Sequence, residues 1–218
     1  MILKNIIANV ATFFTIGVFL AGIEICRKIW RKKSTCDISA LPFVCGLVST
    51  CLWLRYGLII DDLALIIVNG TGACLQVAYL LFYSRYTPVK LTFYKQLSTA
   101  LLIIGILYIF TTFYLEDDVA RNVSGLTSCT AGVIFMASPL ATVAHVVKTK
   151  SVESLPFWMI FCTFVMGTLW LCYGVLTNDY FVQVPNFLGA VLALSQLCLF
   201  AMYSNRKPTY VPLSTLPM

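Results

Sequence analysis

The chain alternates long apolar stretches with short polar segments, and this pattern occurs seven times. Each stretch has the roughly 20 residues that a helix needs to cross about 30 Å of hydrocarbon. The apolar stretches cover residues 6–26, 42–60, 63–83, 97–115, 125–147, 157–177 and 180–203. The sequence therefore predicts an all-α, polytopic membrane protein with seven transmembrane helices.

The later part of the chain repeats the earlier part in the same direction. Each copy contains the pattern Trp-Leu-x-Tyr-Gly, then an acid, then an asparagine inside an apolar stretch. The matching pairs are Trp53 and Trp170, Asp62 and Asp179, and Asn69 and Asn186. Every pair is 117 residues apart (170 − 53, 179 − 62, 186 − 69). We infer a duplicated membrane unit, an arrangement that places binding sites where two repeats meet.

Parallel repeats of three spans need a linker, because three crossings alone would invert the second copy. The stretch 97–115 has no counterpart in the other copy and is predicted to be this linker helix. The predicted organisation is two parallel three-helix bundles joined by one helix (3+1+3). It comprises a first repeat (6–83), the linker (97–115), a second repeat (125–203) and a short cytosolic tail (204–218).

One pair of triplets departs from the constant separation. Leu-Pro-Phe occurs at residues 41–43 and again at 155–157, which are 114 residues apart. The lysines that precede these triplets, Lys33 and Lys150, are still 117 apart. The sequence therefore predicts three more residues in the loop of the first copy, and three fewer between its proline and tryptophan.

Charge placement predicts the orientation. Of the 15 Lys and Arg residues, 12 lie at alternate ends of the spans, within residues 27–33, 85–95, 148–150 and 206–207. The positive-inside rule then puts the N-terminus outside and the C-terminus in the cytosol. The net charge of +6 is accordingly interpreted as a topology signal and not as a nucleic-acid footprint. The plasma (cell) membrane and the membrane of the Golgi apparatus both fit this pattern.

Composition and motifs argue against an enzyme. The chain is 60% hydrophobic and 11% charged, too apolar for a soluble domain. Most of its nine cysteines lie inside apolar stretches, where they are expected to pack as small apolar residues. The chain has no phosphate-binding loop, nucleophile elbow or carboxylate pair. We therefore expect no catalytic residues, no cofactor and no metal.

Counting along the helices places four residues at similar depth. Asn69 lies seven residues after Asp62, and Trp53 lies nine residues before it. At 1.5 Å per residue these are about 10 and 13 Å below the outer surface. Asn186 and Trp170 repeat the spacing in the second copy. All four are therefore expected in one layer near the bilayer centre, where transporter sites occur.

The chemistry of these four residues suits a sugar. An asparagine facing lipid would leave its amide unsatisfied, at a cost of several kcal/mol. An amide facing a water-filled cavity can donate to and accept from hydroxyl groups. Tryptophan faces suit the apolar faces of a pyranose ring. The alternative is that the asparagines bond between helices and the tryptophans fill the core.

These motifs resemble those of the SWEET family of sugar transporters, whose parallel repeats are known. The resemblance rests on Trp-x-x-Tyr-Gly with a following Asn in each copy, and on segments 149–157 and 185–189. It covers about residues 6–203 and is closest to animal members. It implies low-affinity, bidirectional uniport of a hexose such as glucose by alternating access. It also implies that Asn69, Asn186, Trp53 and Trp170 bind the substrate.

Many relatives have a smaller residue where this chain has Trp53, which implies a tighter pocket and argues against disaccharides.

Prolines within spans weaken a helix locally and are expected to act as hinges. We expect hinges at Gly22, Pro42, Pro139 and Pro156, and the resemblance implies an extracellular gate formed by Tyr56, Tyr173 and Asp179. Gly22 stands where the family has a proline matching Pro139 (139 − 117 = 22), and glycine keeps flexibility without a fixed φ. Alternatively, the prolines only mark helix starts and Asp179 only caps a helix.

Energy coupling is judged from the acidic residues. Proton- or sodium-driven carriers usually keep an ionisable residue in the membrane interior. The only acid inside a predicted span is Glu24, which we expect to pair with Arg27 or Lys28 one turn away. The sequence therefore favours a passive uniporter.

Other classes remain open. A proton-coupled carrier of the PQ-loop type would have Pro-Gln where this chain has Gly22-Ile23 and Pro139-Leu140. A seven-span receptor would not require repeats, and a membrane adaptor is a third alternative.

Asn122 begins an outward-facing glycosylation sequon. One chain supplies both units, so a homo-oligomer is allowed but not required for transport.

Overall fold

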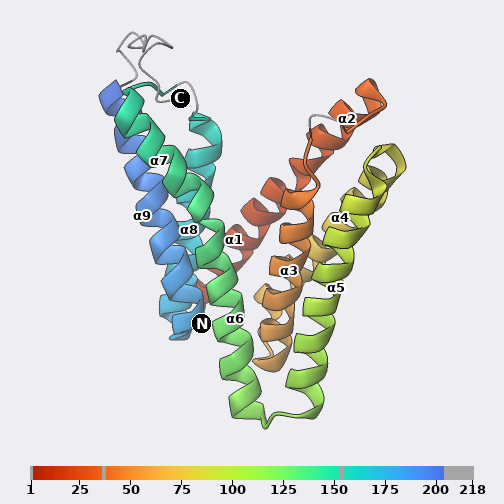
Figure 1. Cartoon of the computed structure of the whole chain (residues 1–218). Helices are drawn as coiled ribbons and strands as arrows, with labels where there is room; N and C mark the ends of the chain where they lie inside the picture. Colours follow the sequence, from red (N-terminus) through yellow and green to blue (C-terminus); the bar gives the residue numbers. More distant parts are fainter. Residues whose placement is uncertain (1, 36–37, 153–154, 204–218) are drawn as a thin grey trace. The chain divides into compact units, whose positions relative to one another are not determined.

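The computed structural model describes residues 2–35, 38–152 and 155–203, and these ranges form nine helices (Figure 1). The helices are α1 (Ile2–Leu20), α2 (Gly22–Lys32), α3 (Leu41–Ile59), α4 (Leu63–Tyr86), α5 (Lys90–Phe113), α6 (Asp117–Phe135), α7 (Ala137–Thr149), α8 (Phe157–Thr177) and α9 (Tyr180–Tyr203). Within the described ranges, seven helical spans are long and apolar enough to cross a membrane. The predicted all-α fold with seven transmembrane spans is confirmed.

Two of the seven spans consist of two helices each. The first span breaks at Ala21 between α1 and α2, and the fifth breaks at Met136 between α6 and α7. At both breaks the backbone hydrogen bond shortens to an i→i−3 pattern, from Ala21 to Val18 and from Met136 to Val133. Such tightened turns accompany kinks in long helices. The breaks lie next to Gly22 and three residues before Pro139.

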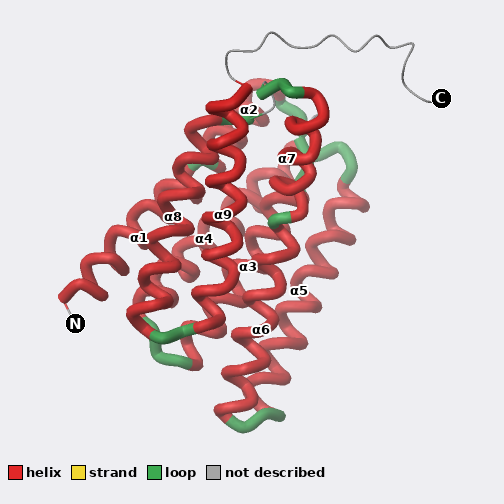
Figure 2. Tube along the Cα trace, turned by 90° about the vertical axis from the view of Figure 1, so that its left-hand side faces the viewer, coloured by secondary structure: helices red, strands yellow, loops and turns green. Residues whose placement is uncertain are grey.

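The chain divides into two compact units, Met1–Gly132 and Val133–Met218. In the first unit α4 is central, because α1, α2 and α3 all pack against it, and α3 also packs against α5. The core of this unit is mostly aliphatic and aromatic. It consists of Ile29, Ala40, Phe43, Val44, Leu47, Tyr79, Leu80, Tyr83, Phe93 and Ala100. A short loop joins α3 to α4, and another joins α8 to α9 (Figure 2).

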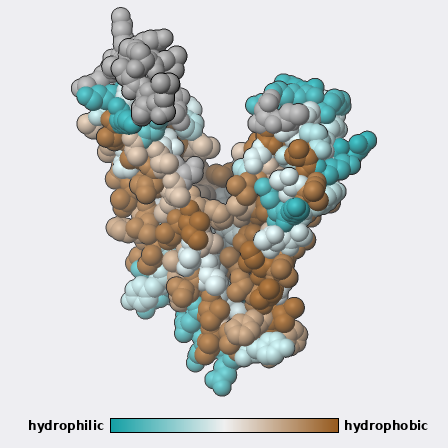
Figure 3. All heavy atoms as spheres, viewed as in Figure 1, coloured by the Kyte–Doolittle hydropathy of each residue, from teal (hydrophilic) through white to brown (hydrophobic). Residues whose placement is uncertain are grey.

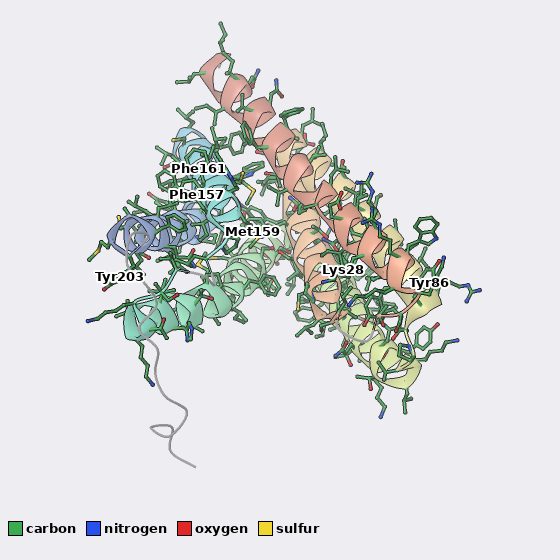
Figure 4. The ribbon with its side chains drawn as sticks, turned by 90° about the horizontal axis from the view of Figure 1, so that it is seen from above. Lys28, Tyr86, Phe157, Met159, Phe161 and Tyr203 are labelled. Atoms are coloured by element: carbon green, nitrogen blue, oxygen red, sulfur yellow. The ribbon has the colours of Figure 1, made fainter. Side chains whose placement is uncertain are left out.

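In the second unit α9 packs against both α7 and α8. Its core contains Val146, Leu155, Ile160 and Ala193. Aromatic rings extend this core along α8, where Phe157 and Phe161 stack with centroids 6.3 Å apart (Figure 4). Phe157 also contacts Phe200 of α9, at 5.1 Å between centroids. In both units, therefore, the third span of the predicted repeat packs against the first two.

Backbone turns repeat with the separation that the sequence shows. The non-glycine residues with positive φ in the described ranges are Lys33 (53°), Asp61 (51°), Lys150 (53°) and Asn178 (55°). They form two pairs, and each pair is 117 residues apart (150 − 33 and 178 − 61). The left-handed region is costly for residues with a side chain. Its use at matching positions shows that the turn geometry is duplicated along with the sequence.

The predicted three-residue difference between the copies is wrong. Residues 33–40 connect α2 to α3, and residues 150–156 connect α7 to α8, a difference of one residue. The Leu-Pro-Phe triplets are not equivalent in structure: Pro42 lies in the first turn of α3, whereas Pro156 is the N-cap of α8. Proline fits both places because neither requires its missing N–H.

Large apolar side chains are exposed on the helix faces of each unit (Figure 3). Phe13, Phe113 and Trp158 are each more than 70% exposed. A protein in water rarely exposes so much contiguous apolar surface. These faces are those of a membrane protein whose surroundings are lipid.

Candidate substrate-binding site

The Trp-x-x-Tyr-Gly motif ends a helix in each unit, and an aspartate starts the next one. The Asp62 N–H donates to the Gly57 carbonyl at 2.9 Å, and the Asp179 N–H donates to the Gly174 carbonyl at 2.8 Å. Asp62 Oδ1 accepts from the Leu65 N–H at 3.1 Å. Both aspartates thus occupy equivalent places, and in both units the motif and the asparagine lie on helices joined by a tight turn.

Asp179 caps the start of α9. Its Oδ1 accepts from the backbone N–H groups of Phe181 at 3.0 Å and Val182 at 3.3 Å. Such a carboxylate satisfies N–H groups that the helix leaves unpaired and faces the positive end of the helix dipole. The structure therefore gives Asp179 a capping role at the start of α9, and its gating role stays a prediction.

The motif glycines allow close contact between consecutive helices. A Cβ atom at Gly57 would lie 2.9 Å from Leu65 Cβ and 3.3 Å from the Ile66 nitrogen. At Gly174 it would lie 2.9 Å from Gln183 Cγ and 3.0 Å from the Gln183 nitrogen. Ile66 and Gln183 are themselves 117 residues apart. Glycine is needed here because backbone atoms occupy the space that a side chain would fill.

The motif tyrosines hold the tryptophans. Trp53 and Tyr56 form a T-shaped pair with centroids 5.9 Å apart, and Trp170 and Tyr173 form another at 5.5 Å. Both tyrosines are buried, at 0% and 2% exposure. Edge-to-face pairs of this kind contribute about 0.5–1.5 kcal/mol beyond their burial. The four rings therefore repeat one local arrangement, in which a buried tyrosine orients its tryptophan.

The two asparagines are held in the same way by their own helices. Asn69 Nδ2 donates to the Leu65 carbonyl at 2.9 Å, and Asn186 Nδ2 donates to the Val182 carbonyl at 2.8 Å. Within the described residues neither amide side chain makes a second hydrogen bond. Each side chain therefore keeps its carbonyl oxygen and one N–H for another partner. The alternative of an amide bonded to a neighbouring helix is not what these contacts show.

Each unit thus carries one tryptophan and one asparagine on packed neighbouring helices, a pair that we call a half-site. The first half-site is Trp53 on α3 with Asn69 on α4. The second is Trp170 on α8 with Asn186 on α9. Asn69 is buried and Asn186 is half-buried.

Pro185 is a feature of the second half-site to which the sequence analysis assigned no role, although segment 185–189 carries part of the family resemblance. It lies inside α9, immediately before Asn186. A proline there cannot donate to the carbonyl four residues earlier, and it weakens the helix locally. The first unit has Val68 at the equivalent position (185 − 117). Proline next to asparagine inside an apolar stretch was the available signal.

The predicted hinge residues lie near helix starts. Gly22 is the first residue of α2, and Pro139 is the third residue of α7. Pro42 and Pro156 lie at the starts of α3 and α8. A proline within the first turn of a helix is tolerated without a break. The positions fit both the hinge interpretation and the simpler one, and hinge motion stays a prediction.

Arg55, the variable residue of the first motif, fastens α3 to α5. It donates from Nε to Thr111 Oγ1 at 3.0 Å and from Nη2 to the Thr111 carbonyl at 2.9 Å. The Tyr108 hydroxyl donates to the Cys51 carbonyl at 2.8 Å one turn away. A cavity of about 550 Å³ adjoins this contact. It is lined by Arg55, Leu58, Ile59, Ile60, Thr111, Asp117, Asp118, Ala120 and Arg121, so it includes no half-site residue.

Other predicted positions lie on helix surfaces. Glu24 forms the expected ion pair with Arg27, in an exposed position on α2. Asn122 is exposed on α6. In the part of the chain that the structure describes, no three His, Cys, Asp or Glu side chains come together as a metal site.

A family model described as "Sugar efflux transporter for intercellular exchange" matches the chain twice, at residues 5–91 and 122–208. The two matches are 117 residues apart at both ends (122 − 5 and 208 − 91). The chain is 39% identical over 204 residues to "Sugar transporter SWEET1" of Drosophila pseudoobscura pseudoobscura, which covers 93% of this chain and 90% of that protein. It is 34% identical over 209 residues to "Bidirectional sugar transporter SWEET17" of Arabidopsis thaliana, which covers 94% and 86%.

The fold is similar to a solved structure as well. A eukaryotic SWEET transporter determined at 3.7 Å resolution superposes with a TM-score of 0.86 and 29% identity. The match covers 94% of this chain and 100% of that one. Sequence and structure therefore agree over nearly the whole length.

Proposed function

The chain belongs to the SWEET family of sugar transporters, and on that premise we propose that it moves a hexose such as glucose passively across a membrane, in both directions. The observation that carries this proposal is the double match of the sugar-transporter family model, over residues 5–91 and 122–208. Relatives named as sugar transporters align over more than 90% of the chain. The seven apolar spans supply the membrane embedding that transport requires.

The substrate contacts are assigned to the two half-sites. Asn69 and Asn186 each use one N–H to anchor the side chain on its own helix. This leaves an amide oxygen and an N–H for sugar hydroxyls, and the anchoring lowers the entropy lost on binding. Trp53 and Trp170, oriented by their tyrosines, provide flat apolar faces for the ring. Each half-site has a fixed polar group and an aromatic face of the kind found in small-molecule sites.

Transport without ion coupling follows from where the acids lie. In the part of the chain that the structure describes, the acids lie in loops or in the first turn of a helix, and Glu24 among them is exposed and paired with Arg27. A proton-driven carrier normally titrates an ionisable group inside the membrane. The substrate gradient is then the only driving force. Motion at Gly22, Pro42, Pro139 and Pro156, with gating by Tyr56, Tyr173 and Asp179, would alternate access.

The N-terminus lies on the extracellular or lumenal side and the C-terminus in the cytosol, as the positive-inside rule requires. The support is the concentration of 12 of 15 basic residues at alternate span ends. The plasma membrane and the Golgi membrane both suit this topology.

Hexose binding and flux in proteoliposomes test the site assignment. Asn186→Ala should weaken hexose affinity about tenfold, because a buried hydroxyl would lose a hydrogen-bond partner. Asn122→Ala, an exposed asparagine of the same kind on α6, is the matched control and should behave as the parent chain. Normal affinity and full flux in the Asn186→Ala variant would remove this residue from the site.

A further inference from the structure

Tyr79 of α4 fills the break in the first span. A Cβ atom at Gly22 would lie 2.7 Å from Tyr79 Cζ and 2.8 Å from Tyr79 Cδ2. Tyr79 is buried, at 6% exposure, and its ring lies 5.5 Å from the ring of Phe43 on α3. The tyrosine ring therefore occupies the volume that a side chain at residue 22 would need, and α3 holds it there.

The Tyr79 hydroxyl also bonds the backbone at this break. It donates to the Phe19 carbonyl at 3.0 Å, in the last turn of α1. Carbonyls at a helix end lack their regular partners, and in a membrane each unsatisfied backbone group is costly. A hydroxyl from the neighbouring helix is thus a specific way to stabilise the broken helix over the continuous one.

The second unit has a corresponding contact. Gln196 of α9 is the counterpart of Tyr79 (196 − 79 = 117), and its Nε2 donates to the Pro139 carbonyl at 3.4 Å. Pro139 is in turn the counterpart of Gly22. In both units, therefore, the third span of the repeat donates a side-chain hydrogen bond to the backbone near the break, to the Phe19 carbonyl before it in the first unit and to the Pro139 carbonyl after it in the second.

The two units use different residue pairs at this contact, Gly22 with Tyr79 in the first and Pro139 with Gln196 in the second. The second pairs a proline in the first turn of α7, where no preceding backbone hydrogen bond is lost, with the amide of Gln196. The first pairs a glycine with a tyrosine, because the phenol ring leaves no room for a side chain at residue 22. The contact with Tyr79 therefore accounts for glycine at residue 22, where the counterpart in the second unit is Pro139.

We propose that Tyr79 and Gln196 are positioning residues for transport: each holds the first span of its repeat in the bent form, and Gly22 and Tyr79 act as one steric pair. The proposal rests on the proposed transport function, since the bends are its expected moving parts. Losing either donor shifts the balance between bent and straight forms of the span. It does not touch the groups assigned to sugar binding.

Kinetics of hexose flux in proteoliposomes separate this role from binding. Tyr79→Phe keeps the ring and removes the hydroxyl. We expect the maximal rate to fall about fivefold, the change that one hydrogen bond is typically worth, with hexose affinity unchanged. Gln196→Leu should act in the same way in the second unit. Tyr83→Phe is the matched control, because the Tyr83 hydroxyl bonds the Ile38 carbonyl in a loop, away from the break.

The steric pair is tested by thermal unfolding of the purified chain, which needs no transport. Gly22→Ala should lower Tm, and Tyr79→Leu in the same chain should restore part of the loss. Gly17→Ala, on α1 with nothing within 4 Å of the added Cβ, should leave Tm unchanged or raise it slightly. Unaltered flux in both Tyr79→Phe and Gln196→Leu would overturn the positioning role. Additive Tm losses for residues 22 and 79 would overturn the pairing, and absent sugar flux in the parent chain would refute the proposed function alone.

Discussion

The Arg55 guanidinium is bonded twice to Thr111, once to the hydroxyl and once to the backbone carbonyl. The guanidinium also lies 5.7 Å from the centre of the ring of Tyr108, which is on α5 with Thr111. One side chain on α3 thereby fixes both the position and the rotation of α5. Hydrogen bonds from a charged donor are stronger than neutral ones, and cation–π contact adds to them.

Arg55→Ala should lower the free energy of unfolding by about 1.5–3 kcal/mol, the usual contribution of hydrogen bonds to a charged group. Thermal unfolding in detergent measures this. Cys172→Ala is the control, since Cys172 is the counterpart of Arg55 (172 − 55 = 117) and is exposed. Equal effects of the two substitutions would contradict the role of Arg55 as a tie to α5.

The motif glycines should not tolerate alanine. Gly174→Ala would push Cβ into the backbone of Gln183, and overpacking of this kind costs about 1–3 kcal/mol. Gly57→Ala should cost less, because the nearest backbone atom, the Ile66 nitrogen, is 3.3 Å from the added Cβ, against 3.0 Å for the Gln183 nitrogen at Gly174. Gly105→Ala on α5, with open space around it, should be neutral or slightly stabilising. The account predicts the lowest unfolding temperature for Gly174→Ala, a higher one for Gly57→Ala and the highest for Gly105→Ala. Equal unfolding temperatures of the three variants would refute it.

Two substitutions at Asp179 separate capping from gating. Asp179→Ala removes the oxygen that accepts from Phe181 and Val182 and should cost about 1 kcal/mol. Asp179→Asn keeps a capping oxygen and removes the charge, so stability should change little. If the carboxylate also gates transport, Asp179→Asn should slow hexose flux at unchanged Tm. Normal hexose flux in the Asp179→Asn variant would show that Asp179 caps α9 and does not gate transport.

Trp53 should limit the size of the sugar. Trp53→Ala shortens a large flat side chain in the first half-site, so the ratio of disaccharide to hexose flux should rise. Trp170→Ala is the comparison in the second half-site, and both variants are scored by uptake of a labelled hexose and disaccharide. A ratio unaffected by Trp53→Ala would show that this side chain does not set the size limit.

The sequence predicted features that depend on spacing. Asp62 and Asp179 could be identified as helix caps because each separates two apolar stretches, and both caps are observed. The seven spans followed from the length of those stretches. The depth of the asparagines was a count along a regular helix and stays a prediction.

Features that depend on packing were out of reach. The apolar pattern runs through Ala21 and Met136 without interruption, and the expected hinges at Gly22 and Pro139 indicated the region of each break but not its residue. The asparagine amides could have bonded to their own or a neighbouring helix with equal satisfaction, and only contacts distinguish the two. The Leu-Pro-Phe match misled because proline is accepted both at an N-cap and in a first turn.

Hexose flux into sealed proteoliposomes, with and without an imposed proton gradient, tests passive sugar transport most directly. The purified chain is the only protein present, and internal hexose is measured over time in both directions of the sugar gradient. We predict that internal and external hexose become equal, with initial rates unaffected by imposing or collapsing the proton gradient. Accumulation above the external concentration driven by that gradient, or no flux of any sugar, would contradict the account.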